Sequence, residues 1–172
     1  MLIVVSGLPG VGKTTIALSL AGETGAAYLR IDSIEQTLRH AGLAVEAEGY
    51  AVAHAVAADN LRLGRLVVAD CVNPWPLTRA EWSEVAARAG VRALDVEVVC
   101  SDRDEHRRRV ESRVADIEGH RVPTWPEVVA GDYRPWSGPR LVIDTARLSA
   151  DEAVRVVLAE IDRGRSEGGP CE

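Results

Sequence analysis

The feature that most constrains this chain is a glycine-rich segment close to its N-terminus. Residues Gly7 to Thr14 read G-L-P-G-V-G-K-T and fit the pattern G-x-x-x-x-G-K-[ST] at every fixed position. The preceding run, residues 2–5, is apolar and β-branched, which is typical of a buried parallel strand. After the segment, apolar residues recur at helical spacing: Ile16, Ala17, Leu20 and Ala21. Strand, glycine loop and helix in this order predict a phosphate-binding P-loop.

The chemistry of such a loop explains its residues. Glycines let backbone N–H groups converge on phosphate oxygens, and the N-terminus of the helix adds partial positive charge. Lys13 is expected to reach the outer phosphates and to act in catalysis, and the Thr14 hydroxyl to ligate Mg²⁺. The alternative is a glycine-rich turn without a ligand. We expect nucleotide contacts from the whole segment: Gly7, Leu8, Pro9, Gly10, Val11, Gly12, Lys13, Thr14 and Thr15.

The use of basic residues supports this interpretation. Lys13 is the only lysine among 20 basic residues, so a chain that otherwise uses arginine has kept a lysine at this position. A regulatory GTPase is excluded in its usual form, because the guanine-specifying motif [NT]-K-x-D needs a second lysine. The net charge of −6 argues against a general nucleic-acid binder.

Length and composition predict a single soluble domain. A chain of 172 residues corresponds to one domain, and 47% hydrophobic with 27% charged residues is ordinary for a globular protein. No apolar run approaches the ~18 residues of a membrane span, and the N-terminus lacks the basic region of a signal peptide. Three widely spaced cysteines fit reduced thiols, so we expect a cytoplasmic protein.

Strand-like and helical stretches alternate along the chain, which predicts an α/β fold with three layers and a parallel sheet. We expect strands at 2–5, 27–31, 66–69, 96–99 and 141–143. Helices are expected at 33–41, 49–63 and 103–117, and two more after the capping boxes Thr78–Glu81 and Ser149–Glu152.

One segment differs from the rest. Residues 118–139 are rich in proline, contain two tryptophans and show little periodicity beyond a short helix start at Thr124–Glu127. We expect this segment to be a small lid, the alternative being a plain surface excursion. The P-loop domain would then span 1–164, followed by a flexible tail at 165–172.

Two further motifs carry a family resemblance. Residues 67–73 read V-V-A-D-C-V-N and are followed by Arg79 and Trp82, while residues 107–113 read R-R-R-V-E-S-R. With the P-loop, they make the chain similar to P-loop kinases of the nucleoside-monophosphate-kinase-like group. Within that group it most resembles the subfamily of polynucleotide 5′-kinase, zeta toxin and chloramphenicol phosphotransferase. The resemblance implies a five-stranded sheet in the order 2-3-1-4-5, and phosphoryl transfer from ATP to a hydroxyl or phosphate acceptor.

The resemblance also implies roles for three groups. Asp32, at the end of the second strand, would accept the proton of the acceptor hydroxyl; the alternative is a helix cap beside the capping box that Ser33 begins. Asp70 would hold the shell of Mg²⁺. Arg109 and Arg113, one helical turn apart, would contact the adenine ring and stabilise phosphate charge, unless they belong to a solvated salt-bridge face.

Other residues are weaker candidates. Thr145 follows the last strand, where such kinases contact the adenine through backbone groups; a helix-entry turn is the alternative. Asn73 and Arg79 would lie near the acceptor pocket, or form a turn and a solvated helix residue. Arg121 would close over the phosphates. The four histidines have no metal-ligand spacing to one another or to the cysteines.

The favoured function is an ATP- and Mg²⁺-dependent kinase that phosphorylates a hydroxyl of a small molecule, such as an antibiotic, a nucleoside-like compound or another metabolite. One alternative is a nucleic-acid 5′-hydroxyl kinase, because the overall charge still allows a short end to bind locally. The other is a nucleotide-binding module without catalysis. Neither the acceptor nor the oligomeric state follows from the sequence.

Overall fold

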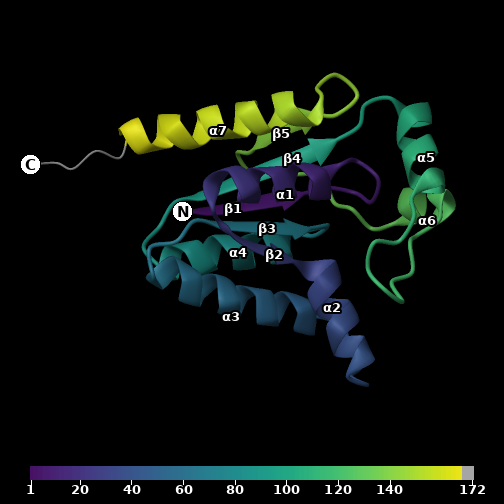
Figure 1. Cartoon of the computed structure of the whole chain (residues 1–172), viewed down its shortest axis with the longest axis horizontal. Coiled ribbons are helices and arrows are strands. Elements are labelled where there is room, and N and C mark those ends of the chain that lie inside the picture. The colour runs from purple at the N-terminus through teal and green to yellow at the C-terminus, as the bar shows by residue number, and fades with distance from the viewer. Residues whose placement is uncertain (168–172) are drawn as a thin grey trace, which may run out of the picture.

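The computed structural model describes residues 1–167 and shows an α/β fold around one parallel sheet (Figure 1). The five strands are β1 (Leu2–Ser6), β2 (Ala27–Arg30), β3 (Val67–Cys71), β4 (Ala93–Val99) and β5 (Leu141–Asp144). They lie in the order β2-β3-β1-β4-β5, and every neighbouring pair is parallel. The predicted fold class and strand order are therefore confirmed.

Helices cover both faces of the sheet. The helices are α1 (Lys13–Thr24), α2 (Ile31–His40), α3 (Glu48–Arg62), α4 (Pro76–Arg88), α5 (Arg103–Ser112), α6 (Trp125–Ala130) and α7 (Ala150–Glu167). Figure 1 shows α1 and α7 on one face of the sheet, and α3 and α4 on the other. In the described part of the chain no helix combines the length and the apolar character needed to cross a membrane.

The central strand explains why both faces are buried. Side chains alternate along a strand, so Ile3 and Val5 pack with α1 and α7, whereas Leu2 and Val4 pack with α3 and α4. All five residues of β1 are buried. The continuous apolar run in the sequence is thus the signature of a strand with a hydrophobic layer on each side.

The parallel strands place one set of loops at a common edge. The loop after β1 leads into α1 at the carboxyl ends of the strands, and α5, α6 and the loop 113–124 lie beyond the same edge (Figure 1). The position of residue 119 shows how far this loop reaches, since a Cβ added to Gly119 would lie 2.9 Å from Nε2 of His40 on α2. The loop 113–124 therefore runs from α5 across to α2.

Several helix boundaries differ from the sequence-based expectation. Helix α2 begins at Ile31 directly after β2, with extended Arg30 as its N-cap, so Asp32 lies in the first turn and Ser33 is not the cap. Helix α4 begins at Pro76, and the predicted capping box at Thr78 is wrong because the Thr78 hydroxyl donates instead to the Trp75 carbonyl. A proline at the first helical position needs no amide partner and starts the helix two residues early.

The region around the predicted lid is also corrected. Helix α5 ends at Ser112 rather than at residue 117, because Arg113 adopts an extended conformation with φ −68° and ψ 127°. The helix start at Thr124 is confirmed, with a complete capping box to Glu127, and so is the box of Ser149 and Glu152. Helix α7 continues to Glu167, three residues into the predicted flexible tail. The rest of that tail, residues 168–172, lies outside the described residues.

Arg79 on α4 fixes the C-terminal half of the predicted lid. Its buried guanidinium donates to four backbone carbonyls, those of Asn73, Pro74, Arg134 and Pro135, at 2.7–3.1 Å. It also lies over the rings of Trp136 and Tyr133, with its Cζ 4.1 and 5.3 Å from their centroids. Arg79 is therefore not a solvated helix residue, because all three nitrogens of its guanidinium donate to backbone carbonyls.

Replacement of this guanidinium tests its structural role. Arg79→Met keeps the apolar stem but leaves buried carbonyls without their donor, so the free energy of unfolding should fall by about 3 kcal/mol. Urea unfolding followed by circular dichroism measures the change. The exposed Arg88→Met on the same helix is the control, and its effect should stay below ~0.5 kcal/mol. Equal effects of the two variants would contradict the role of Arg79.

Candidate functional site: a phosphate-binding loop beneath an arginine helix

The loop between β1 and α1 has a backbone that only glycine adopts easily. Gly7, Gly10 and Gly12 have φ values of 151°, 85° and 93°. A Cβ on Gly7 would lie 2.4 Å from the Val98 carbonyl oxygen, and a Cβ on Gly10 would lie 2.5 Å from Cγ2 of Val110 on α5. The glycines therefore serve both the left-handed turns and the close approach of the loop to β4 and α5.

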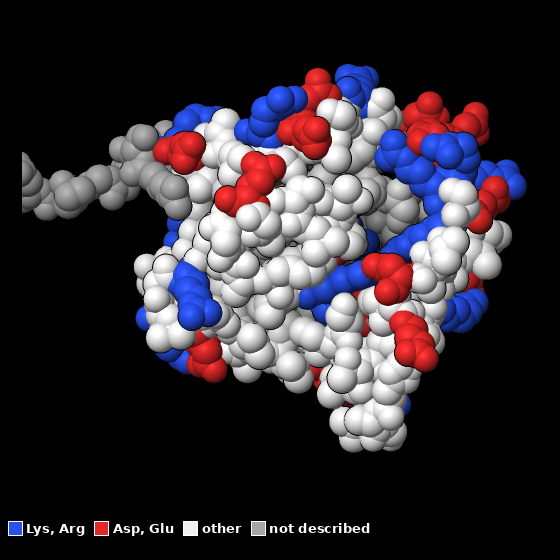
Figure 2. Space-filling model, viewed as in Figure 1, with Lys and Arg blue, Asp and Glu red and all other residues white. Residues whose placement is uncertain are grey.

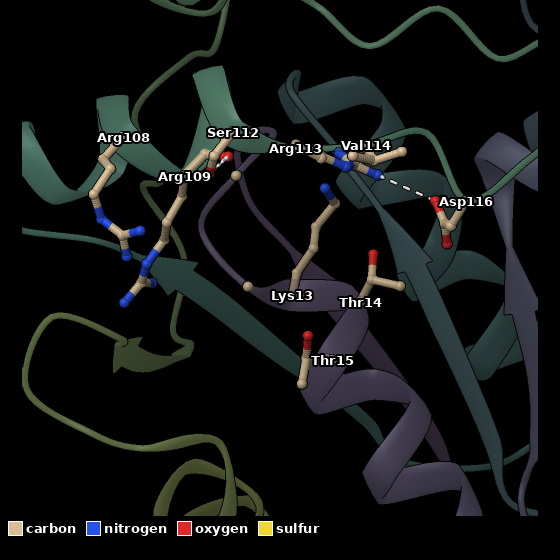
Figure 3. A pocket seen from close by; sticks show the side chains of 11 residues that line it. Lys13, Thr14, Thr15, Arg108, Arg109, Ser112, Arg113, Val114 and Asp116 are labelled. Carbon is tan, nitrogen blue, oxygen red and sulfur yellow. Dashed lines mark hydrogen bonds and ion pairs between the residues drawn. The ribbon is translucent and has the colours of Figure 1, made fainter.

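The loop delivers the start of α1 into a cavity of about 360 Å³ (Figure 3). The first backbone N–H groups of a helix have no carbonyl partner within the helix, and at α1 they belong to Lys13, Thr14 and Thr15. These three residues line the cavity from below, and residues of α5 and the following loop line it from above: Arg108, Arg109, Ser112, Arg113, Val114 and Asp116.

The charge of the cavity is strongly positive. Four of its lining residues are basic, namely Lys13, Arg108, Arg109 and Arg113, and one, Asp116, is acidic. In Figure 2 basic side chains gather around a hollow on the side of the molecule where α5 lies. Only 4% of Lys13 is exposed, and the residue lines the cavity; among the described residues its ammonium group makes no hydrogen bond or ion pair. A cation that faces a cavity without a partner from the protein suits this site to an anion.

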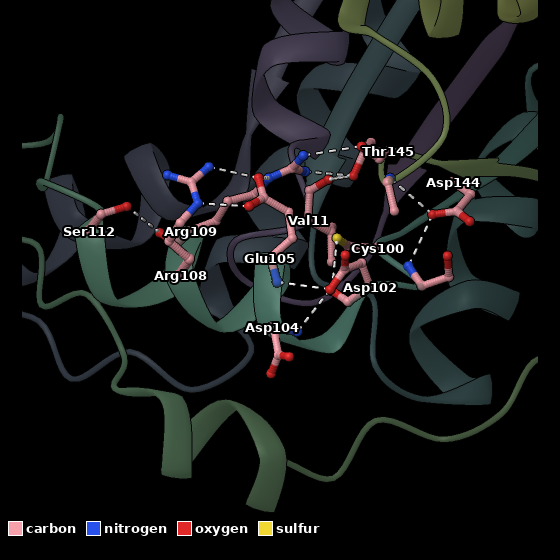
Figure 4. Close-up of polar contacts among 12 residues, drawn as sticks. Val11, Cys100, Asp102, Asp104, Glu105, Arg108, Arg109, Ser112, Asp144 and Thr145 are labelled. Atoms are coloured by element: carbon pink, nitrogen blue, oxygen red, sulfur yellow. Dashed lines mark hydrogen bonds and ion pairs between the residues drawn. The ribbon is translucent and has the colours of Figure 1, made fainter.

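Arg109 connects α5 to the end of β5 (Figure 4). Its guanidinium donates to the Thr145 hydroxyl at 2.8 Å and to the Thr145 carbonyl at 3.1 Å, and it pairs with Glu105 at 2.7 Å. Hydrogen bonds from Arg108 and Arg109 lower the pKa of Glu105 to about 2. The Thr145 hydroxyl lies 2.8 Å from the Val11 carbonyl, so this network joins the P-loop, β5 and α5.

Arg113 lines the same cavity, but not from the helix predicted to carry it. It lies just beyond the end of α5, so it does not share a helical face with Arg109, and its Nη2 is 3.8 Å from Asp116. Asp116 is bound more tightly by Arg30 of β2, through contacts of 2.5 and 2.9 Å. These hydrogen bonds lower the pKa of Asp116 to about 2. The pair of Arg30 and Asp116 fastens the loop 113–124 to the sheet.

Asp70 lies on β3 next to β1, with Val5 as its register partner. Its Oδ2 accepts a hydrogen bond of 2.9 Å from the Tyr28 hydroxyl, and Nε of Arg30 lies 3.9 Å away. Burial and the nearby Asp70 carboxylate raise the pKa of Tyr28. The other oxygen, Oδ1, is buried without a hydrogen-bond partner among the described residues. A carboxylate with one fixed and one unpaired oxygen is a chemically suitable group for the hydration shell of Mg²⁺.

The remaining candidates lie around this centre. Asp32 is half-buried in the first turn of α2, where the helix dipole stabilises a negatively charged carboxylate. Asn73 is fully buried in a left-handed conformation (φ 53°), and its amide nitrogen donates to the Ser6 hydroxyl at 3.1 Å. Arg121 pairs with Glu127 beside α6 and does not line the cavity of about 360 Å³.

Two features of the site had no signal in the sequence. The pair of Arg30 and Asp116 joins residues 86 positions apart, and no motif marks either of them. His106 on α5 donates from Nε2 to the Pro9 carbonyl at 2.8 Å, and its ring packs edge-on against Trp125 of α6. The histidine thus ties the tip of the P-loop to both helices above it, a contact that depends on tertiary packing alone.

With this geometry established, comparison with known proteins places the chain. A family profile described as AAA domain matches residues 2–125, which include the P-loop, the strand that bears Asp70 and helix α5. The chain belongs to this AAA_33 family. It has a kinase-like P-loop domain, and no curated protein matches its sequence.

Solved structures share the whole fold at low sequence identity. A protein from Chloroflexus aurantiacus is 24% identical with a TM-score of 0.73, covering 95% of this chain and 96% of the other. The Mycobacterium tuberculosis APS kinase CysC, in complex with AMPPNP and APS, is 22% identical with a TM-score of 0.71, covering 94% and 96%. A gluconokinase from Sinorhizobium meliloti is 20% identical with a TM-score of 0.66, covering 96% and 93%. These neighbours share the fold of this AAA_33 domain.

The loop geometry makes a prediction about Gly10. In Gly10→Ala the new methyl group meets Val110 at 2.5 Å and the left-handed φ is strained, so the loop tip must move. Calorimetric titration with AMPPNP and Mg²⁺ should show affinity reduced by on the order of 100-fold, since displaced amides lose several phosphate contacts. Gly25→Ala is the matched control, because it has the same left-handed strain (φ 67°) with open space around it. Unaltered affinity in Gly10→Ala would contradict the prediction.

Proposed function

We propose that the protein is an ATP-dependent kinase that transfers the γ-phosphate to a hydroxyl group of a small molecule. The observation that carries this proposal is the ammonium of Lys13, which lines a positively charged cavity at the start of α1 and has no anionic partner among the described residues. A triphosphate satisfies both this charge and the unpaired amides of the helix. The kinase-like fold of the AAA_33 domain supports the same assignment.

The reaction follows from the groups around the cavity. The acceptor oxygen attacks the γ-phosphorus, the bond from phosphorus to the bridging oxygen breaks, and ADP leaves with the bonding electrons. Negative charge on the transferred and bridging oxygens is stabilised by the Lys13 ammonium, the amides of the loop and the Arg113 guanidinium. Arg113 would exchange its 3.8 Å contact with Asp116 for the phosphates.

The residues present fit a magnesium ion. The Thr14 hydroxyl would ligate it directly, and the unpaired Oδ1 of Asp70 would hold its water shell. Bound Mg²⁺ supplies charge neutralisation to the β- and γ-phosphate oxygens. The hydrogen bond from Tyr28 holds Oδ2 of the Asp70 carboxylate, which leaves Oδ1 for the water shell.

Asp32 is proposed as the group that receives the acceptor's proton. The first turn of α2 lies at the same edge of the sheet as the P-loop, and the Asp32 side chain in that turn is half-buried. Because α2 begins at Ile31, Asp32 is not needed as a cap, and Ser33 does not cap the helix either. One carboxylate suffices, since in phosphoryl transfer the base mainly orients the nucleophile.

The nucleotide's base would lie beside Arg109. Its guanidinium, fixed by Thr145 and Glu105, presents a planar group at the rim of the cavity, where it can stack on the adenine. Within kinases, we retain the likeness to polynucleotide 5′-kinase, zeta toxin and chloramphenicol phosphotransferase as part of this proposal. We also place the reaction in the cytoplasm, since Cys71 and Cys100 are free thiols.

Two alternatives remain distinguishable by experiment. A nucleic-acid 5′-hydroxyl kinase would need cations for the phosphates next to the reacting end, yet Arg30, Arg79 and Arg121 are all engaged within the protein. A nucleotide-binding module without catalysis would bind ATP but transfer no phosphate. The small-molecule acceptor is therefore the assignment that the charges favour.

Loss of the lysine charge tests the function directly. Lys13→Met keeps the apolar stem and removes the ammonium, so ATP-dependent phosphorylation across a panel of acceptors should fall by about 10²–10³-fold or more. Transfer of labelled phosphate measures the rate, and circular dichroism verifies folding. Arg88→Met, on the distant α4, should keep full activity. Equal turnover in Lys13→Met and the wild type would refute the assignment.

Asp32→Asn separates a proton acceptor from a structural residue. If Asp32 accepts the proton, Asp32→Asn should lower kcat by about 10²-fold or more and change the KM for ATP little. If Asp32 only stabilises the first turn of α2, the substitution should lower the free energy of unfolding by about 0.5 kcal/mol and leave kcat unchanged. Steady-state kinetics and thermal unfolding on the same preparation distinguish the two results.

A further inference from the structure

A second cavity lies on the other side of the P-loop tip. It has a volume of about 230 Å³ and lies between the loop after β1, the loop after β3 and the end of α6. Its walls include Pro9 from the first, Trp75 from the second, and Val128, Gly131 and Tyr133 from the third. Pro9 lines this cavity while the adjacent Gly10 lines the one with Lys13. Consecutive residues of the loop tip therefore contribute to the two cavities.

The lining of this second cavity is apolar. Aliphatic surface comes from Leu8, Pro9, Val72 and Val128. Trp75, which is 47% exposed, contributes an indole at the rim. A partly exposed tryptophan at the rim of an aliphatic cavity is typical of a site that takes a flat apolar group.

Charge in the second cavity disfavours an anionic ligand. Among the described residues no lysine or arginine lines it, and its two carboxylates are already paired. Asp132 accepts from Nε1 of Trp75 at 3.1 Å and pairs with Arg134 at 2.7 Å, and Glu127 accepts from Thr124 and pairs with Arg121. A phosphate, sulfate or carboxylate placed here would meet two carboxylates and no free cation, which is unfavourable.

We infer that this second cavity binds the non-reacting part of the acceptor, and that the acceptor is a neutral molecule with an aromatic or alicyclic ring beside its hydroxyl group. The inference rests on the proposed kinase function and defines its substrate class. The ring would pack between Trp75, Val128 and the proline at the loop tip, so that the hydroxyl reaches around Pro9 toward the γ-phosphate. The oxygen of that hydroxyl forms the new bond to phosphorus, as described above, and its proton passes to Asp32.

The experiment compares defined acceptors and two variants. Neutral ring alcohols (benzyl alcohol and 2-phenylethanol), an anionic polyol (gluconate) and a 5′-hydroxyl oligonucleotide are offered with ATP and Mg²⁺, and phosphate transfer is measured. Saturation-transfer NMR with 2-phenylethanol measures binding without turnover. Gly131→Leu adds a side chain to the cavity wall at φ −61°, a backbone that any residue adopts. Trp75→Ala removes the indole, and Gly138→Leu, in open space within the same segment, is the control.

We expect transfer to the ring alcohols in preference to the two anionic acceptors. Gly131→Leu and Trp75→Ala should each raise the KM for the ring alcohol by on the order of 10-fold, with AMPPNP affinity and the behaviour of Gly138→Leu unchanged. Preference for gluconate or the oligonucleotide, or an unchanged KM in both variants, would overturn the inference while the kinase function stands. Binding of 2-phenylethanol that Gly131→Leu abolishes, without transfer to any acceptor, would support the cavity and refute the kinase function. Absence of both binding and transfer would refute both.

Discussion

The arrangement at the sheet edge depends on one electrostatic imbalance. Lys13 lies at the start of α1 and lines the cavity, beside backbone N–H groups that the helix cannot satisfy, and no described carboxylate pairs with it. An ammonium group next to the positive end of a helix is unfavourable without an anion. The surrounding structure must hold it there, which it does through β1, buried along its whole length, and through glycines that pack against β4 and α5.

Other charges near this centre are balanced within the protein. Arg30 contacts Asp70 and Asp116 and so joins β2 to the loop 113–124. Arg109 contacts Glu105 and Thr145 and joins α5 to the end of β5. Arg79 donates to four carbonyls and joins α4 to the segment 133–136. These arginines position the site, whereas Lys13, which has no such partner among the described residues, is available to a ligand.

The sequence predicted the centre of the fold well and its periphery less well. A fixed-spacing motif between a β-branched run and a helix has few structural solutions, so the strand, loop and helix of the P-loop were predicted from the residues themselves. The order of the five strands came from the family resemblance, because spacing along the chain does not determine it. Helix ends were less accurate. Arg103–Ile117 looks uniformly helical, but Arg113 is extended, because the chain turns there toward Arg30 and Asp116. For Arg79 the alternative of a solvated helix residue was wrong for a related reason: its partners are backbone carbonyls, which no sequence pattern displays.

Two buried guanidinium groups attach residues 113–136 to the rest of the protein. Moving the loop 113–124 would part Asp116 from Arg30, whose side chain is only 8% exposed, and moving residues 133–136 would take two carbonyls from Arg79. A buried cation that loses its partner is strongly destabilising. A ligand that displaced either half of this segment would therefore have to offer the freed guanidinium an acceptor of its own.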